Sequence, residues 1–198
     1  IDLDNSLKKN IYNLADCKNK DITELTACLL DRPRHKKIIE ELNELKVNLK
    51  LISDGDISGA LLVSNESYGV DIFMGIGGGP EGVLAASALD AYNCNFQGRF
   101  IFKEENDISR AKKMGIKELD RKYELSEIVS GDSIFCATGI TSGDLVNGIE
   151  IIEDKYSSET LVTHKKSNTK KVIKRTENLT LWFQSPTKYG VKDKLKKD

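Results

Sequence analysis

Apolar residues in the first half of the chain follow two alternating spacings. Short apolar runs that stop at polar or glycine-rich segments predict strands over residues 25–30, 47–52 and 70–76. Apolar residues three or four positions apart predict helices over residues 4–16, 34–45, 57–63 and 83–89. Each predicted strand is followed by a helix. This alternation is typical of an α/β fold with a largely parallel central sheet flanked by helices.

The pattern is less regular beyond residue 100. A helix is predicted over residues 106–114 and a strand over residues 133–137. Two β-rich segments, residues 158–164 and 170–176, are joined by a polar turn and predict a C-terminal antiparallel β-hairpin. Residues 186–198 are polar and rich in lysine, which is typical of a disordered tail. We therefore expect one α/β domain over residues 1–185, followed by this tail.

Composition excludes several classes of protein. The chain has 198 residues, 39% hydrophobic and 31% charged, which is enough apolar material for one domain with a core. A net charge of −1 gives no general attraction to nucleic acid, so no nucleic-acid partner is expected. No apolar run is long enough to cross a membrane, so no membrane partner is expected either. The four cysteines form no CxxC pair and the first residues show no signal-peptide pattern, so we expect no zinc site and a cytoplasmic location.

The end of the first predicted strand carries two arginines around a proline, in the segment Asp31-Arg-Pro-Arg-His35. Guanidinium groups match the geometry of phosphate and stay charged, and Pro33 restricts the backbone between them. A helix that begins here would add a favourable potential for an anion. Arg32, Pro33 and Arg34 are therefore candidate phosphate-binding residues. Taken alone, a solvated basic turn explains the segment as well.

The end of the second predicted strand carries two carboxylates around a glycine, Asp54-Gly55-Asp56. These side chains can accept hydrogen bonds from sugar hydroxyls or hold a divalent cation. A capped turn before a helix is the alternative, because aspartate and glycine are common there.

The end of the third predicted strand is the most informative, because it leads into three consecutive glycines, Gly77–Gly79, followed by Pro80 and Glu81. Glycines expose backbone N–H groups and let a ligand approach closely, and proline suits the first turn of a helix. A carboxylate beside a phosphate is favourable only when a cation lies between them, so Gly78 and Glu81 indicate a metal-bridged phosphate. The alternative is a tight turn in which Glu81 is merely stabilised by the helix dipole. The spacing fits neither a GxGxxG fingerprint nor a P-loop.

Ligands of open α/β sheets bind beyond the carboxyl ends of the strands, which is where all three segments lie. We therefore expect the arginines, the aspartate pair and the glycine–glutamate corner to form one pocket. The segment Thr138–Asp144 is interpreted as a structural turn rather than a further site loop. His35 is expected to lie behind the site or in solvent, and not to act as a general base.

Six segments, in this order and spacing, resemble class II fructose-1,6-bisphosphatase. They are Asp31-Arg-Pro-Arg-His35, Ile52-Ser-Asp-Gly-Asp56, Gly75-Ile-Gly-Gly-Gly-Pro-Glu-Gly-Val83, Gln97-Gly-Arg99, Ala111-Lys-Lys-Met-Gly-Ile116 and Phe135-Cys-Ala-Thr-Gly-Ile-Thr-Ser-Gly-Asp-Leu145. The resemblance implies a layered sugar-phosphatase fold, Mn²⁺ or Mg²⁺ as cofactor, and removal of the 1-phosphate of fructose 1,6-bisphosphate in gluconeogenesis.

The same resemblance implies roles for individual residues. Arg32 and Arg34 would bind substrate phosphate, Asp54 and Asp56 the sugar, and Gly78 the substrate. Glu81 would be a metal ligand. It also implies a homo-oligomer when the enzyme is intact, and leaves sedoheptulose 1,7-bisphosphate open as a second substrate.

The family has acidic motifs in an N-terminal half, of the type Gly-Glu-Gly-Glu and Asp-Pro-x-Glu-Gly-Thr, and this sequence contains neither. No catalytic residue is therefore assigned, and we expect this chain alone to have little or no phosphatase activity. Two alternatives remain open: a non-catalytic module that binds sugar phosphates, and a nucleotide-binding α/β domain. The second is disfavoured by the missing phosphate fingerprints.

Overall fold

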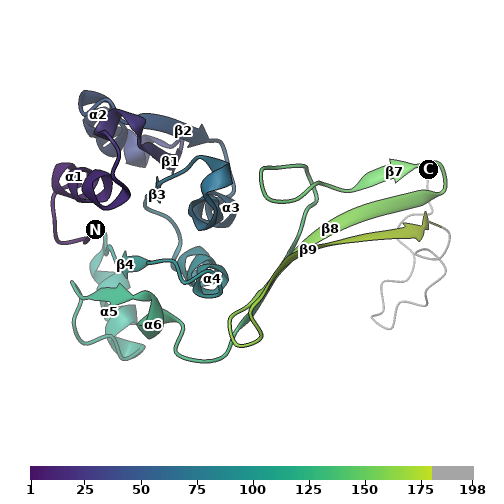
Figure 1. Ribbon diagram of the computed structural model, residues 1–198. Coiled ribbons are helices and arrows are strands. Elements are labelled where there is room, and N and C mark those ends of the chain that lie inside the picture. Colours follow the sequence, from purple (N-terminus) through teal and green to yellow (C-terminus); the bar gives the residue numbers. More distant parts are fainter. Residues whose placement is uncertain (180–198) are drawn as a thin grey trace, which may run out of the picture. The chain divides into compact units, whose positions relative to one another are not determined.

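The computed structural model describes residues 1–179 (Figure 1). The domain boundary expected at residue 185 and the tail expected over residues 186–198 lie outside these residues. The chain divides into two compact units. The first comprises Ile1–Phe135 with Val162–Lys171, and the second comprises Cys136–Leu161 and the described residues from Val172 on.

The described residues form a mixed α/β structure. The α-helices are α1 (Leu7–Lys18), α2 (Lys36–Glu44), α3 (Asp56–Leu61), α4 (Gly79–Asp90), α5 (Glu105–Lys113) and α6 (Leu125–Ile128). Short 3-10 turns cover Ile22–Glu24, Pro33–His35, Leu62–Ser64 and Glu66–Tyr68. The strands are β1 (Thr26–Leu30), β2 (Asn48–Ile52), β3 (Ile72–Phe73), β4 (Gln97–Arg99), β5 (Lys122–Glu124), β6 (Ile134–Thr138), β7 (Glu150–Ile152), β8 (Lys155–His164) and β9 (Thr169–Asn178).

A small parallel sheet, in the order β2-β1-β3, organises the first unit. Alternate residues of the central strand β1 face opposite sides of this sheet. On one side, Ala27 and Leu29 pack with α1 and α2 in a cluster that includes Ile11 and Leu42. The predicted strand–helix alternation and the parallel pairing are confirmed.

The other side of the sheet is covered by α3, which packs in turn against α4. A Cβ atom added to Gly59 of α3 would lie 2.6 Å from the Cδ1 atom of Ile52 and 2.8 Å from the ring of Phe73. Only a glycine therefore allows this close approach of helix and sheet. Short connections lead from the carboxyl ends of β2 and β3 to the first residues of α3 and α4.

Asp71 joins the starts of two strands, a role that the sequence pattern did not indicate. Its carboxylate accepts a hydrogen bond from the Thr26 amide at 2.9 Å and ion-pairs with the ammonium groups of Lys18 and Lys20, each at 2.9 Å. Its own amide donates to the backbone oxygen of Thr26. Burial raises the pKa of this carboxyl, but the lysines and the amide outweigh burial and hold the pKa below its ordinary value.

Replacing Asp71 with asparagine is expected to destabilise the fold by about 2 kcal/mol near neutral pH, because charge-assisted hydrogen bonds are lost. The lowered pKa means that the folded state binds fewer protons than the unfolded state. The stabilisation is therefore present above the ordinary pKa of aspartate and is lost as the pH falls through the lowered value. Urea unfolding of both proteins measures this. The exposed Asp16 of α1 provides the control, and a gap that persists in strong acid would contradict the assignment.

The C-terminal strands form a second, antiparallel arrangement. A sheet in the order β6-β8-β7 is extended by β9, which pairs with β8. The predicted hairpin is confirmed, although its strands are longer than the apolar pattern indicated. The strand predicted over residues 133–137 is β6, and it belongs to this sheet and not to the parallel one.

The segment after β6 is held by close packing around two glycines. A Cβ atom at Gly139 would lie 2.3 Å from the backbone oxygen of Asn147, and one at Gly148 would lie 2.6 Å from the amide nitrogen of Ser142. The Glu159 carboxylate accepts hydrogen bonds from the backbone and side-chain nitrogens of Asn147. The interpretation of Thr138–Asp144 as a structural turn stays a prediction.

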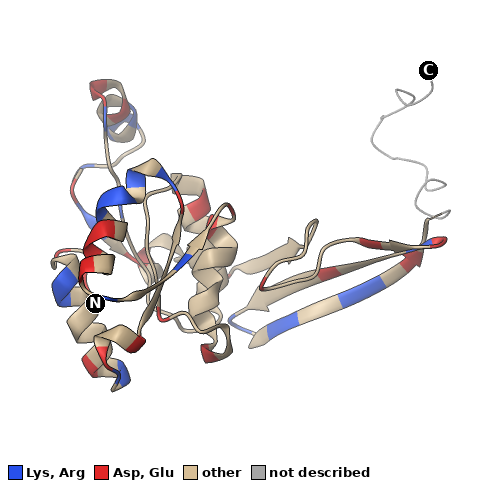
Figure 2. Cartoon of the chain, turned by 90° about the horizontal axis from the view of Figure 1, so that it is seen from above, with Lys and Arg blue, Asp and Glu red and all other residues tan. Residues whose placement is uncertain are grey.

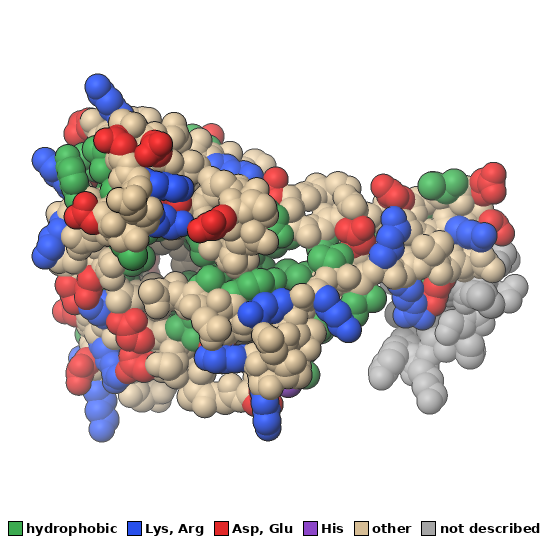
Figure 3. Space-filling view, viewed as in Figure 1, with side chains coloured by type: hydrophobic (Ala, Val, Ile, Leu, Met, Phe, Trp, Pro, Cys, Tyr) green, Lys and Arg blue, Asp and Glu red, His purple; other side chains and the backbone are tan. Residues whose placement is uncertain are grey.

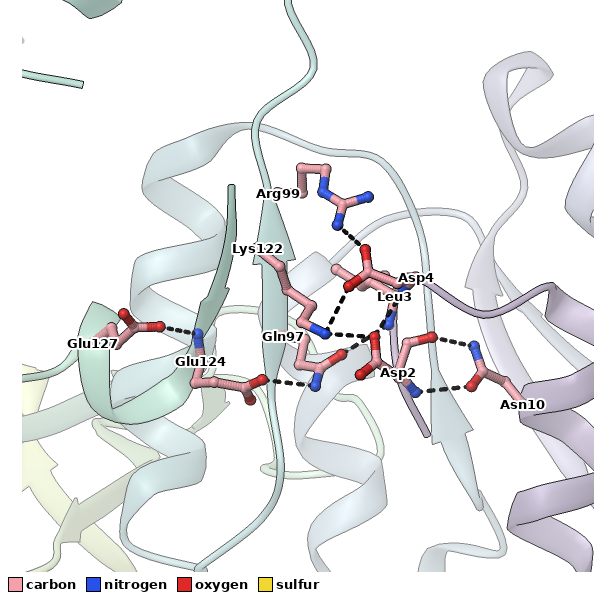
Figure 4. Close-up of polar contacts among 9 residues, drawn as sticks. All are labelled: Asp2, Leu3, Asp4, Asn10, Gln97, Arg99, Lys122, Glu124 and Glu127. Atoms are coloured by element: carbon pink, nitrogen blue, oxygen red, sulfur yellow. Dashed lines mark hydrogen bonds and ion pairs between the residues drawn. The ribbon is translucent and has the colours of Figure 1, made fainter. Parts of the chain in front are cut away.

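A polar network fastens the first residues to the ribbon formed by β4 and β5 (Figure 4). The Lys122 ammonium contacts Asp2 at 2.5 Å and Asp4 at 3.0 Å, and Arg99 also donates to Asp4. The Leu3 amide donates to the side-chain oxygen of Gln97 at 2.8 Å. In this structure, Gln97 and Arg99 of the Gln97-Gly-Arg99 motif thus contact the first residues of the same chain.

Replacing Lys122 with methionine is expected to speed hydrogen exchange at the Leu3 amide, because Asp2 and Asp4 lose the cation they share. Lys122 lowers the pKa of Asp2, while Arg99 first and Lys122 second lower that of Asp4. The contacts are therefore lost as the pH falls through these lowered values. The protection of the Leu3 amide, measured relative to an unstructured peptide at the same pH, should then fall in the unsubstituted protein too. Lys117→Met, at an exposed lysine, is the control. Equal exchange in all three proteins would refute this prediction.

Charge is mixed over the first unit. Figure 2 shows basic and acidic residues interspersed along its helices. The space-filling view shows a similar mixture on the face that it presents (Figure 3). An anion would therefore be attracted by local groups and not by a broad basic surface. Among the helices of residues 1–179, none has the length and apolarity needed to cross a membrane.

Candidate functional site

The segment from Met74 to Glu81 leaves the parallel sheet earlier than predicted and forms the centre of the candidate site. The strand β3 ends at Phe73, although a hydrogen bond from the Met74 amide to the backbone oxygen of Cys28 continues the ladder by one residue. The next residues turn away from the sheet and lead into α4, which has Gly78 as its N-cap and a proline in its first turn. We call residues 75–81 the glycine loop.

Two side chains from the end of β1 contact the glycine loop. The Nε atom of Arg34 donates a hydrogen bond to the backbone oxygen of Ile76. The His35 ring accepts a hydrogen bond from the Ile76 amide at 2.8 Å through Nε2, and its Nδ1 atom lies 2.8 Å from the backbone oxygen of Leu30. The neutral tautomer with its proton on Nδ1 satisfies both contacts.

His35 is completely buried, so the expectation that it might lie in solvent is wrong. A Cβ atom at Gly75 would lie 3.2 Å from the His35 ring, which shows how closely the loop packs on it. The histidine therefore joins the end of β1 to the glycine loop. It lies behind the loop, in agreement with the other half of that expectation.

The end of β2 supplies an aspartate to the same loop. Gly55 has a φ of 91°, in the left-handed region that favours glycine, and this turn starts α3. Asp56 is half-buried in the first turn of α3, and its Oδ2 atom would lie 3.2 Å from a Cβ atom added to Gly77. The Asp54 side chain is exposed and accepts a hydrogen bond from the Gly55 amide at 2.8 Å.

Glu81 folds back over the start of its own helix. A Cβ atom added to Gly78 would lie 2.1 Å from the Oε2 atom of Glu81, so the carboxylate occupies space that only a glycine leaves free. The side chain is exposed. Within residues 1–179 there is no group of three or more His, Cys, Asp or Glu side chains that could hold a metal ion. Glu81 fits the role of a single ligand but does not form a metal site with its described neighbours.

The structure brings some of the residues that the sequence singled out to the glycine loop. Arg34 contacts the loop at Ile76, Asp56 lies beside Gly77, and Glu81 lies over Gly78. Arg32 precedes the 3-10 turn that Pro33 begins, and contacts from Arg32 or Asp54 to the loop do not appear among those described. The functional role of every one of these residues stays a prediction.

The arrangement places one guanidinium and two carboxylates at a short, glycine-rich loop that leads into a helix. Backbone N–H groups at such a corner can bind phosphate oxygens, and the guanidinium adds a fixed positive charge. The two carboxylates can accept hydrogen bonds from hydroxyl groups. The fold and the loop thus define an α/β protein with a candidate site for a ligand that carries both phosphate and hydroxyl groups.

Comparison with known proteins defines the family. The family described as bacterial fructose-1,6-bisphosphatase, glpX-encoded, matches residues 1–177, and the chain belongs to it. A D-fructose 1,6-bisphosphatase class 2/sedoheptulose 1,7-bisphosphatase from Synechocystis sp. is 34% identical over 186 residues, which cover 87% of this chain and 54% of that protein. A protein of the same description from Crocosphaera subtropica is 33% identical, and the match covers 96% of this chain and 57% of that protein. Another, from a Synechococcus strain, is 35% identical, and the match covers 87% of this chain and 54% of that protein. The chain spans about half the length of the curated relatives it matches.

Proposed function

We propose that this chain supplies the substrate-binding residues of a metal-dependent phosphatase that removes the 1-phosphate of fructose 1,6-bisphosphate. One observation carries the proposal: side chains from the ends of three parallel strands meet at a single glycine loop. Family membership and the names of the relatives support this choice of ligand. Those names also make sedoheptulose 1,7-bisphosphate a second candidate substrate.

Each residue has a proposed role that follows from its chemistry. Arg32 and Arg34, with Pro33 between them, anchor a phosphate by charge and by paired N–H donors. Asp54 and Asp56, around Gly55, accept hydrogen bonds from sugar hydroxyls. Gly78 lets the ligand approach the backbone. Binding of the remote phosphate and the hydroxyls holds the reacting phosphate in position.

Glu81 has the role of one ligand to Mn²⁺ or Mg²⁺. Bound beside the glycine loop, the cation would neutralise the repulsion between this carboxylate and a phosphate. Further ligands are needed because Mg²⁺ prefers about six oxygen ligands, and the described residues do not group enough side chains for this. No catalytic residue is assigned to this chain for the same reason.

Two measurements on the purified 198-residue chain test the proposal. Calorimetry is expected to show micromolar binding of fructose 1,6-bisphosphate, and a phosphate-release assay with Mn²⁺ is expected to show little or no turnover. Absence of binding would contradict the proposed site. Robust turnover would contradict the view that this chain holds only one metal ligand.

A non-catalytic sugar-phosphate-binding module is the second candidate, because a complete metal-ligand group is absent from residues 1–179. In that case affinity for the sugar bisphosphate would not change on addition of Mn²⁺. A metal-dependent gain in affinity that Glu81→Gln removes would favour the phosphatase. Competition by ATP or NAD would instead indicate a nucleotide-binding domain.

Two broader expectations belong to the same proposal. Cys17, Cys28, Cys94 and Cys136 form no disulfide bond within residues 1–179, which fits a reducing compartment such as the cytoplasm. A homo-oligomer is the proposed state of the intact enzyme. Sedimentation of the native protein tests this second expectation.

A further inference from the structure

Phe100 lies beside the glycine loop although it comes from a different part of the first unit. It follows β4 directly and is 43% exposed. Its Cε1 atom would lie 3.7 Å from a Cβ atom added to Gly79. Gly79 is the first residue of α4 and the neighbour of Gly78. The aromatic ring therefore reaches the same corner that Glu81 covers from the helix.

Other aromatic side chains hold the Phe100 ring in place. The ring stacks on Phe102, with centroids 5.9 Å apart and planes 27° apart, and meets Tyr123 edge-on at 5.8 Å. Tyr123 belongs to β5 and lies beneath the guanidinium of Arg121 at 5.0 Å. Two ring contacts, with Phe102 and Tyr123, thus hold a ring that still has more than two fifths of its surface in solvent. Such contacts between aromatic rings favour a defined orientation.

The side chains of Arg34, Asp56 and Glu81 at the loop are charged. They can bind phosphate oxygens and hydroxyl groups, but they offer nothing to the C–H groups of a sugar carbon chain. An exposed aromatic ring next to a polar site is suited to that part of a ligand, because it buries C–H groups and removes water. Phe100 is the described side chain of this type for which a contact with the glycine loop is found.

We propose that Phe100 is a specificity-determining residue: its ring forms an apolar wall of the site against which the carbon chain of a sugar bisphosphate packs. This proposal rests on the proposed function, since it assumes that a sugar bisphosphate binds at the glycine loop. With this apolar wall, the site selects a phosphorylated sugar over a bare polyphosphate, because the polyphosphate carries no C–H groups.

A structural role for Phe100 makes a different prediction. If the ring only supported the start of α4, its removal would disturb the loop itself. All phosphate ligands would then bind more weakly, with or without a carbon chain. Comparison of a sugar bisphosphate with inorganic pyrophosphate therefore separates the two roles.

The experiment measures the affinity of the 198-residue chain and two variants for fructose 1,6-bisphosphate and for inorganic pyrophosphate by calorimetry. Phe100→Leu keeps an apolar side chain without the ring, and Phe100→Ala removes the wall. The expected result for Phe100→Ala is a loss of affinity of about five- to tenfold for the sugar bisphosphate and less than about twofold for pyrophosphate. A smaller selective loss is expected for Phe100→Leu. Ile101→Ala alters a neighbouring side chain that is 60% exposed, and it should change neither affinity.

Three results would overturn the proposal. Equal losses for both ligands would show a structural role, and unchanged affinity for the sugar bisphosphate in both variants would show that the ring does not touch it. Failure of the unsubstituted chain to bind the sugar bisphosphate would refute the proposed function, and this inference with it. If Phe100→Ala does not fold, Phe100→Leu decides between the first two results.

Discussion

Replacing Arg34 with glutamine is expected to weaken binding of fructose 1,6-bisphosphate by about ten- to a hundredfold. A hydrogen bond to a charged group contributes roughly 1.5–3 kcal/mol, and every ~1.4 kcal/mol is a factor of ten. Arg34 is held ready for this role by the hydrogen bond from its Nε atom to the backbone oxygen of Ile76, which leaves its terminal nitrogens free to donate to a ligand. Calorimetric titration with the sugar bisphosphate measures the effect.

Two further variants show whether the loss of affinity comes from the planar donors of Arg34 or from its charge alone. Arg34→Lys keeps the charge but loses the planar pair of donors, so an intermediate loss is expected. Lys36→Gln removes the same charge two residues away, from a side chain that is paired with Glu40 at 3.8 Å and lies in the exposed first turn of α2. It should change affinity by less than about twofold at moderate salt. Equal binding by Arg34→Gln and the unsubstituted chain would remove Arg34 from the site.

Replacing His35 with leucine is expected to destabilise the protein by about 3 kcal/mol. The substitution leaves the backbone oxygen of Leu30 and the amide of Ile76 without their partner, and a buried unsatisfied polar group costs roughly 1–3 kcal/mol. Urea denaturation at constant pH measures the change. Affinity for the sugar bisphosphate should fall as well, because the glycine loop loses its attachment to β1.

The second histidine of the chain provides a control. His164 interacts with Asp132 at 2.8 Å and with Ser167 at 2.7 Å, but these partners are exposed and can bond to water instead. His164→Leu should therefore destabilise the protein by less than about 1 kcal/mol. A cost for His35→Leu no greater than that for His164→Leu would mean that the two buried backbone groups find other partners.

The sequence predicted the parallel part of the fold well because strong local signals mark it. The apolar run that ends at Leu30 is buried on both faces, and such runs stand out against polar flanks. The meeting of Arg34, Asp56 and Glu81 at one loop could be predicted for a related reason. The carboxyl ends of parallel strands lie at the same edge of a sheet, so residues after each strand are neighbours in space.

The sequence could not predict contacts that depend on distant pairing. The strands Gln97–Arg99 and Lys122–Glu124 have three residues each, which is too few for a periodic pattern. The position of Phe100 beside Gly79 depends on how that ribbon lies against α4, and no local signal encodes it. The hairpin strands were predicted too short, since residues 155–157, 169 and 177–178 are mostly polar and carry no apolar alternation.

The attachment of the glycine loop by His35 has a consequence for the kinetics of binding. Because the backbone on both sides of Ile76 is fixed by hydrogen bonds before any ligand arrives, association requires no slow rearrangement of this segment. A titration followed by rapid mixing should then show a single phase whose rate rises linearly with ligand concentration.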